Sequence, residues 1–261
     1  MLTFLLGSVN KGLSEMSNQL SEDIIIANAY DFFIEFFNKR SENYDRHKFN
    51  KKTLKFNPFT VQALAKGIGD VATPKTIAKA LVYPYALGTS ISTAFGTKTQ
   101  QFIVKAMGDS VTPSIVTGMD IEYIDQIDNR KKYCQLKAGP TTINKDDIET
   151  ICNHFKGLMR LGITNHLTVS NIDCVTGVLY GEDSDLSSMY LTIRKNGYVV
   201  SAGQEFWYHL TGYKDMYQKM IKIANVAAGQ SSMKSSIEGM VNRAEQYISE
   251  NKERFGIFDQ K

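Results

Sequence analysis

Residues 118–137 read GMDIEYIDQIDNRKKYCQLK, and both ends of this stretch alternate polar with apolar side chains. Alternation at a period of two residues predicts β-strands, in which successive side chains point to opposite faces. The turn-forming residues Asp128-Asn129-Arg130 separate the two alternating parts. The sequence therefore predicts that these two strands pair as a hairpin.

The polar positions of this hairpin are of the kind that binds a metal ion. Alternation places Asp120 and Glu122 on one face of the first strand, and Tyr133, Gln135 and Lys137 on one face of the second. If the two faces coincide, a carboxylate, an amide oxygen and an ammonium group converge on one spot. A Mg²⁺-dependent phosphodiesterase needs oxygen ligands for a hard cation, and a lysine that orients the attacking water or neutralises charge on the phosphate.

The spacing alone is weak evidence for such a site, because an acid followed at this distance by a lysine is common in unrelated proteins. In the alternative interpretation, Asp120 and Glu122 lie on the solvent face of an amphipathic strand, and Lys137 is an ordinary lysine of an edge strand. Further sequence context has to decide between the two.

Downstream of the hairpin, the spacing of apolar residues predicts both helices and buried strands. Asn144 is placed to cap a helix whose first turn holds Asp146 and Asp147 and whose apolar positions recur at helical spacing as far as Met159. Buried strands are predicted at 174–180, 189–193 and 198–201, and helices at 204–210, 216–227 and 233–248.

Upstream of the hairpin, the first 110 residues are predicted to be mainly helical. Ser21 precedes a capped helix over 24–37, and further helices are expected at 75–81 and 97–107, with a turn rich in Gly, Ser and Thr at 88–96. The expected fold is α/β (α+β), a mixed central sheet flanked by helices with a largely helical N-terminal region. We expect residues 1–110 to form the mainly helical region and 111–261 to carry the sheet and the C-terminal helices, together in one compact unit.

Two groups of residues are candidates for contact with phosphate. Between Lys39 and Lys55 the chain gathers basic side chains with aromatic residues among them, which suits a polyanion but equally suits a solvated loop. A predicted helix N-terminus offers backbone N–H groups to a phosphate, although capping alone explains Asn144. The candidates for DNA contact are Arg46, Lys48, Lys51, Lys52, Thr141, Thr142, Asn144 and Lys145.

Composition excludes several classes of protein. The net charge of +3 is too small to prove a polyanionic partner, and no segment is apolar and long enough to span a membrane. Three widely spaced cysteines favour neither a disulfide framework nor a zinc site, which fits the reducing cytoplasm. The histidines lack metal-site spacing; His154 is interpreted as a surface or packing residue, and Trp207 as a core residue rather than a base-stacking one.

The hairpin resembles the PD-(D/E)xK nuclease core, with Gly118-Met119-Asp120 at the first motif and Gln135-Leu136-Lys137 at the second. Three blocks then occur in the order found in type II restriction endonucleases that cut GGNCC and its extended form RGGNCCY. The length and block order are most similar to the GGNCC branch. The blocks are QLKAG at 135–139, GVLYG at 177–181 and AGQEFW at 202–207, with shorter similar stretches at 57–59 and 93–96.

This resemblance implies particular roles. Asp120 matches the metal-binding aspartate, and Lys137 matches the catalytic lysine. Gln135 occupies the position at which PD-(D/E)xK nucleases usually have a second acidic residue. Glu122 is the candidate that compensates for the missing charge, and the backbone carbonyl of Leu136 is another candidate ligand. The implied cofactor is Mg²⁺.

The resemblance also implies the substrate and partners, and it assigns DNA binding or dimerisation to residues 1–110 and the catalytic core to residues 111–261. We expect a cytoplasmic homodimer that cuts both strands of double-stranded DNA at GGNCC after the first G, leaving three-base 5′ extensions, beside a cognate DNA methyltransferase that protects the host. Two alternatives remain open at this point: a DNA-binding protein without catalytic activity, and a structure-specific repair nuclease.

Overall fold

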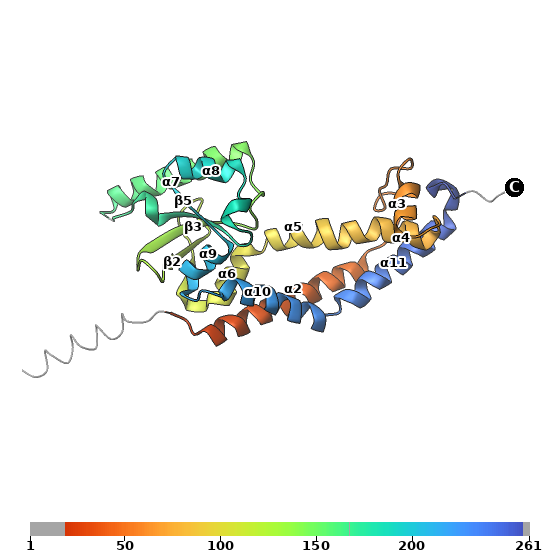
Figure 1. Ribbon diagram of the computed structural model, residues 1–261, viewed down its shortest axis with the longest axis horizontal. Helices are drawn as coiled ribbons and strands as arrows, with labels where there is room; N and C mark the ends of the chain where they lie inside the picture. The colour runs from red at the N-terminus through yellow and green to blue at the C-terminus, as the bar shows by residue number, and fades with distance from the viewer. Residues whose placement is uncertain (1–18, 167, 258–261) are drawn as a thin grey trace, which may run out of the picture. The chain divides into compact units, whose positions relative to one another are not determined.

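The computed structural model describes residues 19–166 and 168–257 (Figure 1). The chain divides into two units, one made of Met1–Phe32 with Gly96–Ala224 and the other of Phe33–Phe95 with Asn225–Lys261. Helices α2 (Glu22–Arg46) and α10 (Met216–Gln230) contribute residues to both. This division differs from the boundary expected at residue 110, because the second unit combines a segment from before that residue with one from the C-terminal part.

A five-stranded mixed sheet forms the centre of the first unit. Its order is β1-β2-β3-β4-β5, with antiparallel pairing from β1 to β3 and parallel pairing from β3 to β5. The predicted hairpin is confirmed as β2 and β3, and the predicted mixed sheet with flanking helices is confirmed as well. The strands are β1 (Val111–Pro113), β2 (Ile121–Ile124), β3 (Lys131–Lys137), β4 (Cys174–Val178) and β5 (Val199–Ala202).

Helices cover both faces of this sheet. Helices α7 (Lys145–Thr164) and α8 (Ser188–Lys195) lie together on one side (Figure 1), where their apolar residues share a core with Tyr133, Val178 and Val200. Helices α6 (Thr99–Met107) and α9 (Gly203–Thr211) cover the other side, and Trp207 of α9 is buried 5.8 Å from the ring of Phe102. The prediction that Trp207 is a core residue is therefore confirmed.

One predicted strand is wrong. Residues 189–193 lie in helix α8, not in a strand, because the parallel neighbours β4 and β5 need a crossover connection and a helix is the usual one. Tyr190 and Ile193, three residues apart, are both buried on its inner face, and Asn196 ends the helix. The connection between two parallel strands therefore determines the conformation of residues 189–193, although their composition favours a strand.

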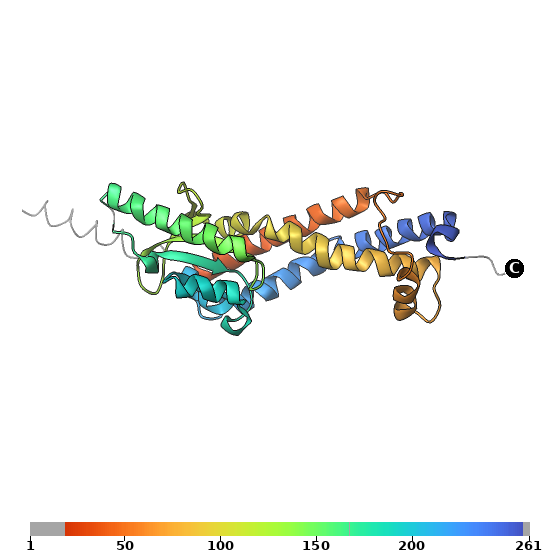
Figure 2. The same ribbon diagram turned by 90° about the horizontal axis from the view of Figure 1, so that it is seen from above.

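The second unit is helical, as the sequence predicts for its N-terminal part. Helices α4 (Pro74–Tyr83) and α11 (Met233–Glu250) lie side by side (Figure 2), and the apolar stripe of α11 is buried in their common core. Helix α3 (Val61–Ile68) packs on α4. The turn expected at 88–96 is wrong: a π-helical segment at Pro84–Ser90 and α5 (Ile91–Gly96) continue the helix, since Gly88 lowers helix propensity without forbidding the conformation.

Four short 3₁₀ turns complete the described chain, at Gly108–Ser110, Asn171–Asp173, Asp183–Asp185 and Lys252–Phe255. Within the described residues, no helix has the length and apolar character that crossing a membrane requires.

Candidate active site

The register of the hairpin brings the two sets of polar residues to one face of the sheet. Glu122 lies opposite Tyr133, and the ladder continues past the end of β2 because the Asp120 amide donates to the Cys134 carbonyl at 2.8 Å. Cross-strand partners point to the same side, so Asp120 lies beside Gln135. The condition on which the predicted site depended is met.

Asp120 is tied to both neighbouring segments. One carboxylate oxygen, Oδ2, accepts a hydrogen bond from the Leu136 amide at 2.6 Å, and the Asp120 carbonyl accepts from the Gln100 side chain at 2.6 Å and from the Ser114 amide at 3.1 Å. Burial raises the pKa of Asp120, and the Leu136 N–H and the positive charge of Lys137 offset this rise only in part. The carboxylate is thus held in place in surroundings that disfavour an uncompensated negative charge.

Gln135 is buried, with its amide nitrogen fixed by two acceptors. Nε2 donates to the Gly118 carbonyl and lies 2.9 Å from Nδ1 of His154, on helix α7. A carbonyl oxygen only accepts, so the contact with Gly118 sets which end of the amide is the nitrogen. The other end, Oε1, is buried and has no hydrogen-bond partner among the described residues. The same is true of Oγ1 of Thr176, which neighbours Gln135 in the register of β4.

Lys137 is the last residue of β3 and is half-buried. It is close enough to Asp120 to lower the pKa of that carboxyl group. Among the described residues, its ammonium group makes no hydrogen bond or ion pair, which leaves it available to a ligand. The three residues predicted as the catalytic set, Asp120, Gln135 and Lys137, therefore lie at one place.

Glu122, the candidate for compensation, is engaged elsewhere. One carboxylate oxygen accepts from the Ser114 hydroxyl at 2.7 Å and the other pairs with Lys131 at 2.7 Å. It would have to leave both partners to act as a ligand. The backbone amide of Leu136 donates to Asp120. The backbone carbonyl of Leu136 remains a predicted metal ligand.

The residues around Asp120 fit a hard divalent cation. The donors are one carboxylate and one neutral amide oxygen, and the buried, unpartnered Oε1 of Gln135 is an acceptor that the protein itself does not satisfy. Mg²⁺ is typically held by one or two carboxylates together with substrate phosphate and water. Within the described residues no three His, Cys, Asp or Glu side chains gather at a possible metal site.

The predicted phosphate site before α7 is built as a cap. The Asn144 side chain accepts from the amides of Asp146 at 2.8 Å and Asp147 at 3.1 Å, so capping is confirmed. The Thr142 hydroxyl donates to the Gly139 carbonyl at 2.8 Å. Thr141 and Lys145 are exposed and free to meet a phosphate.

The basic candidates of the N-terminal region lie in the second unit. Arg46 ends α2, where it pairs with Glu42 at 3.3 Å, while Lys48, Lys51 and Lys52 are exposed in the following loop. They remain candidates for contact with phosphate.

Two residues of the site were missed by sequence reasoning. His154 contacts Gln135, and a Cβ atom on Gly118, whose φ is +83°, would lie 2.2 Å from Cγ of His154. The expectation that His154 packs against its surroundings holds, but its partner is the site itself. Its position beside buried Ile151 and Phe155 on the helix was the available signal.

Comparison with known proteins identifies a family for this chain. The model of the family described as type II restriction endonuclease EcoO109I matches residues 27–232. No curated protein gives a significant match. The family match spans most of the chain and includes the whole hairpin and its neighbouring strands, and this chain belongs to the EcoO109I family of type II restriction endonucleases.

Proposed function

We propose that the chain cleaves double-stranded DNA at GGNCC, with Mg²⁺ as cofactor, by hydrolysis after the first G. The observation that carries this proposal is the placement of Asp120, Gln135 and Lys137 on one face at the end of the hairpin. Family membership makes the chain a site-specific deoxyribonuclease, which sets aside the alternatives of a DNA-binding protein without activity and a repair nuclease. The GGNCC sequence itself rests on the likeness of the sequence blocks.

Different residues of the protein bind the cation and position the attacking water at the scissile phosphate. Asp120 and the Oε1 atom of Gln135 would hold the cation, and His154 and Gly118 fix the amide nitrogen of Gln135. Mg²⁺, when bound, would polarise the phosphate and make a coordinated water more acidic. The Lys137 ammonium, which no described residue engages, positions the attacking water and balances charge that develops on the phosphate oxygens.

A neutral amide in place of a second acid has a consequence for this site. One carboxylate leaves the ligand set with a single negative charge, so the proposal expects weaker cation binding than a two-acid site would give. The DNA phosphate then contributes a larger share of the negative charge that holds the cation.

Cleavage of both strands implies an assembly of two copies. A nearly palindromic site presents equivalent phosphates related by two-fold symmetry, and a homodimer with one active site per strand matches that symmetry. A cognate methyltransferase would protect the host DNA, and the expected place of action is the cytoplasm, where incoming DNA is met.

The first test is cleavage of linear DNA that carries several GGNCC sites, with Mg²⁺ and with EDTA. We expect discrete fragments with three-base 5′ extensions that require Mg²⁺ and are lost in Asp120→Ala and Lys137→Ala. Lys195→Ala, an exposed lysine in the last turn of α8, is the matched control and should cut normally. DNA that is bound but never cut would refute the proposed function, and fragments ending at another sequence would refute the GGNCC specificity.

A further inference from the structure

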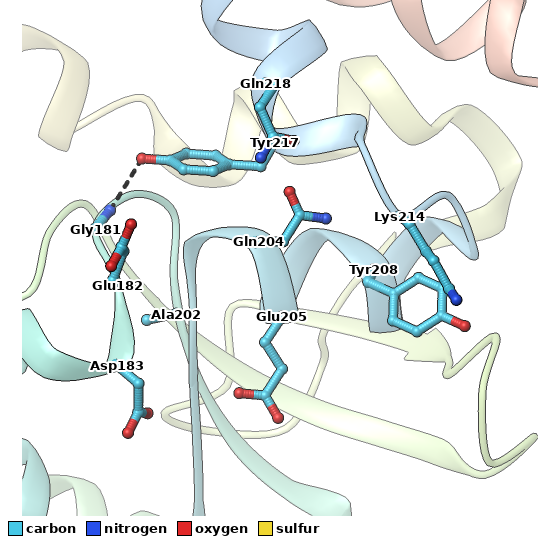
Figure 3. Close-up of a pocket in the computed structure, with 10 residues that line it drawn as sticks. All are labelled: Gly181, Glu182, Asp183, Ala202, Gln204, Glu205, Tyr208, Lys214, Tyr217 and Gln218. Atoms are coloured by element: carbon cyan, nitrogen blue, oxygen red, sulfur yellow. Dashed lines mark hydrogen bonds between the residues drawn. The ribbon is translucent and has the colours of Figure 1, made fainter.

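A separate cavity lies at the same edge of the sheet as Lys137. It has a volume of about 650 Å³ and is lined by the loop after β4 and by helices α9 and α10. Figure 3 shows Gln204, Glu205 and Tyr208 of α9 opposite Glu182 and Asp183 of the loop, with Tyr217 and Gln218 of α10 completing the wall.

The sheet register measures how far this cavity is from the candidate active site. Lys137 pairs with Val178, and Val178 pairs with Ala202, which lines the cavity. Adjacent strands are separated by about 4.8 Å, so Ala202 lies about 10 Å from Lys137 along the edge. Base pairs rise by about 3.4 Å each, so a duplex that follows this edge with its scissile phosphate at Lys137 would bring bases about three pairs away to the cavity.

The chemistry of the cavity suits a ligand that donates hydrogen bonds. Three carboxylates and one lysine, Lys214, line it. Asp183 is satisfied by a two-bond pair with Arg194, whereas Glu205 is exposed and makes no hydrogen bond or ion pair within the described part of the chain. Oε1 of Gln204 is buried, and no group in the described ranges 19–166 and 168–257 forms a hydrogen bond with it. Phosphate is disfavoured here, because three carboxylates and only one lysine line the cavity.

At this cavity the backbone at the end of β5 lies very close to the backbone of the loop after β4. Gly203 has φ of +46°, and a Cβ atom there would lie 2.0 Å from the Gly181 carbonyl, so only glycine allows β5 to meet the loop. The Gly181 amide in turn donates to the Tyr217 hydroxyl at 3.1 Å (Figure 3). The first turn of α9, with Gln204 and Glu205, is thereby fixed at the sheet edge.

We propose that Glu205 and Gln204 read the exocyclic amino group of a cytosine in the recognition site, with Glu205 as the main acceptor. The inference rests on the proposed function, because GGNCC is what restricts the fixed bases to G and C. A carboxylate that accepts from the N4 amino group is a direct way to recognise cytosine in the major groove. Guanine offers only acceptors there, which these two side chains do not match in the same way.

The test pairs a change in the protein with a change in the base. Wild-type protein and Glu205→Ala are compared on duplexes with one GGNCC site, and on duplexes in which either cytosine is replaced by 2-pyrimidinone, which lacks the amino group. A good base contact is worth about 1–3 kcal/mol, so each single change should lower kcat/KM by roughly 5- to 150-fold. For the cytosine that Glu205 reads, the two changes together should cost no more than either alone.

The controls separate the possible outcomes. Asp31→Ala removes an exposed acid from α2 and should discriminate against the altered base as wild type does. Glu205→Ala should keep the wild-type melting temperature, since the side chain is exposed. If the two changes multiply for both cytosines, the proposed contact is refuted while the nuclease stands. If wild type neither cuts GGNCC nor prefers to bind it, the proposed function fails and the inference fails with it.

Discussion

The amide nitrogen of Gln135 lies 2.9 Å from Nδ1 of His154. Since the nitrogen donates, Nδ1 accepts, and the imidazole carries its proton on Nε2. The same nitrogen donates to the Gly118 carbonyl, so both amide hydrogens are used. The pair of residues therefore determines where Oε1 of Gln135 points.

The first prediction concerns His154. Replacement by Ala removes one of the two groups that orient the amide, and we expect a 10- to 100-fold weaker response to Mg²⁺, as is usual when the partner of a metal ligand is lost. The measurement is the cleavage rate as a function of Mg²⁺ concentration. Asn153→Ala, at the exposed neighbouring position of α7, is the control. A lower maximal rate at an unchanged Mg²⁺ midpoint would contradict an orienting role.

The second prediction concerns Gly118. Its φ of +83° disfavours any other residue, and a Cβ atom would lie 2.2 Å from Cγ of His154. We expect Gly118→Ala to lower the free energy of unfolding by roughly 1–3 kcal/mol, measured by urea denaturation. Gly157→Ala is the matched control: this glycine lies within α7 with nothing within 4 Å of an added Cβ, so the substitution should stabilise the protein by roughly 0.5–1 kcal/mol. Equal effects at both positions would show that the close contact with His154 is absent.

The third prediction concerns the missing acid. Gln135→Glu restores a charge but replaces a donor with an acceptor opposite the Gly118 carbonyl. We expect the variant without metal to be less stable by roughly 1–3 kcal/mol. Mg²⁺ should raise its melting temperature more than that of wild type, because two neighbouring carboxylates then share the cation. Gln135→Ala lacks the acceptor and should gain nothing from Mg²⁺. A Glu variant as stable as wild type in EDTA would argue against the described amide contacts.

The fourth prediction concerns stability in acid. Asp173 is buried, which by itself would raise its pKa, but hydrogen bonds from Arg130 at 2.6 Å and from Ser170 at 2.8 and 2.9 Å outweigh burial and lower the pKa. A carboxyl group whose pKa is lower in the folded state stabilises the fold above the unfolded value, about 3.9, and this stabilisation is lost as pH falls through the folded value.

Asp173→Asn should therefore be less stable than wild type at pH 7, and the difference should shrink below about pH 4. Unfolding by urea between pH 3 and 7 measures it. Asp109→Asn, at an exposed acid, should leave the acid part of the stability profile unchanged. A difference between Asp173→Asn and wild type that stays constant with pH would show that the charge of Asp173 is not what stabilises this corner of the sheet.

The hairpin could be predicted because its information is local. Alternation from Asp120 to Lys137 specifies the strands and the faces, and the observed register follows from a turn that the sequence shows directly. The cap at Asn144 is local in the same sense. The family blocks added the roles of Asp120 and Lys137, which spacing alone does not supply.

Other features depend on distant segments and could not be predicted. Residues 189–193 have strand-like composition, and only the parallel pairing of β4 with β5 makes them a helix. The contact of His154 with Gln135 depends on how α7 crosses the sheet, and the use of Glu122 by Lys131 depends on side-chain geometry. The cavity beside Glu205 is formed by three segments whose meeting no local pattern encodes.

The pairing of α4 with α11 also constrains the order in which this chain acquires structure. The two helices are separated by about 150 residues of sequence, so during synthesis the side of α4 that packs on α11 has no native partner until almost the whole chain has been made. Contacts between residues so far apart in the sequence slow folding and prolong the time for which apolar surface is exposed to solvent. Newly made chains should therefore depend on chaperones, and removal of residues 233–257 should yield an aggregating product even though the sheet that holds Asp120 and Lys137 is intact in sequence.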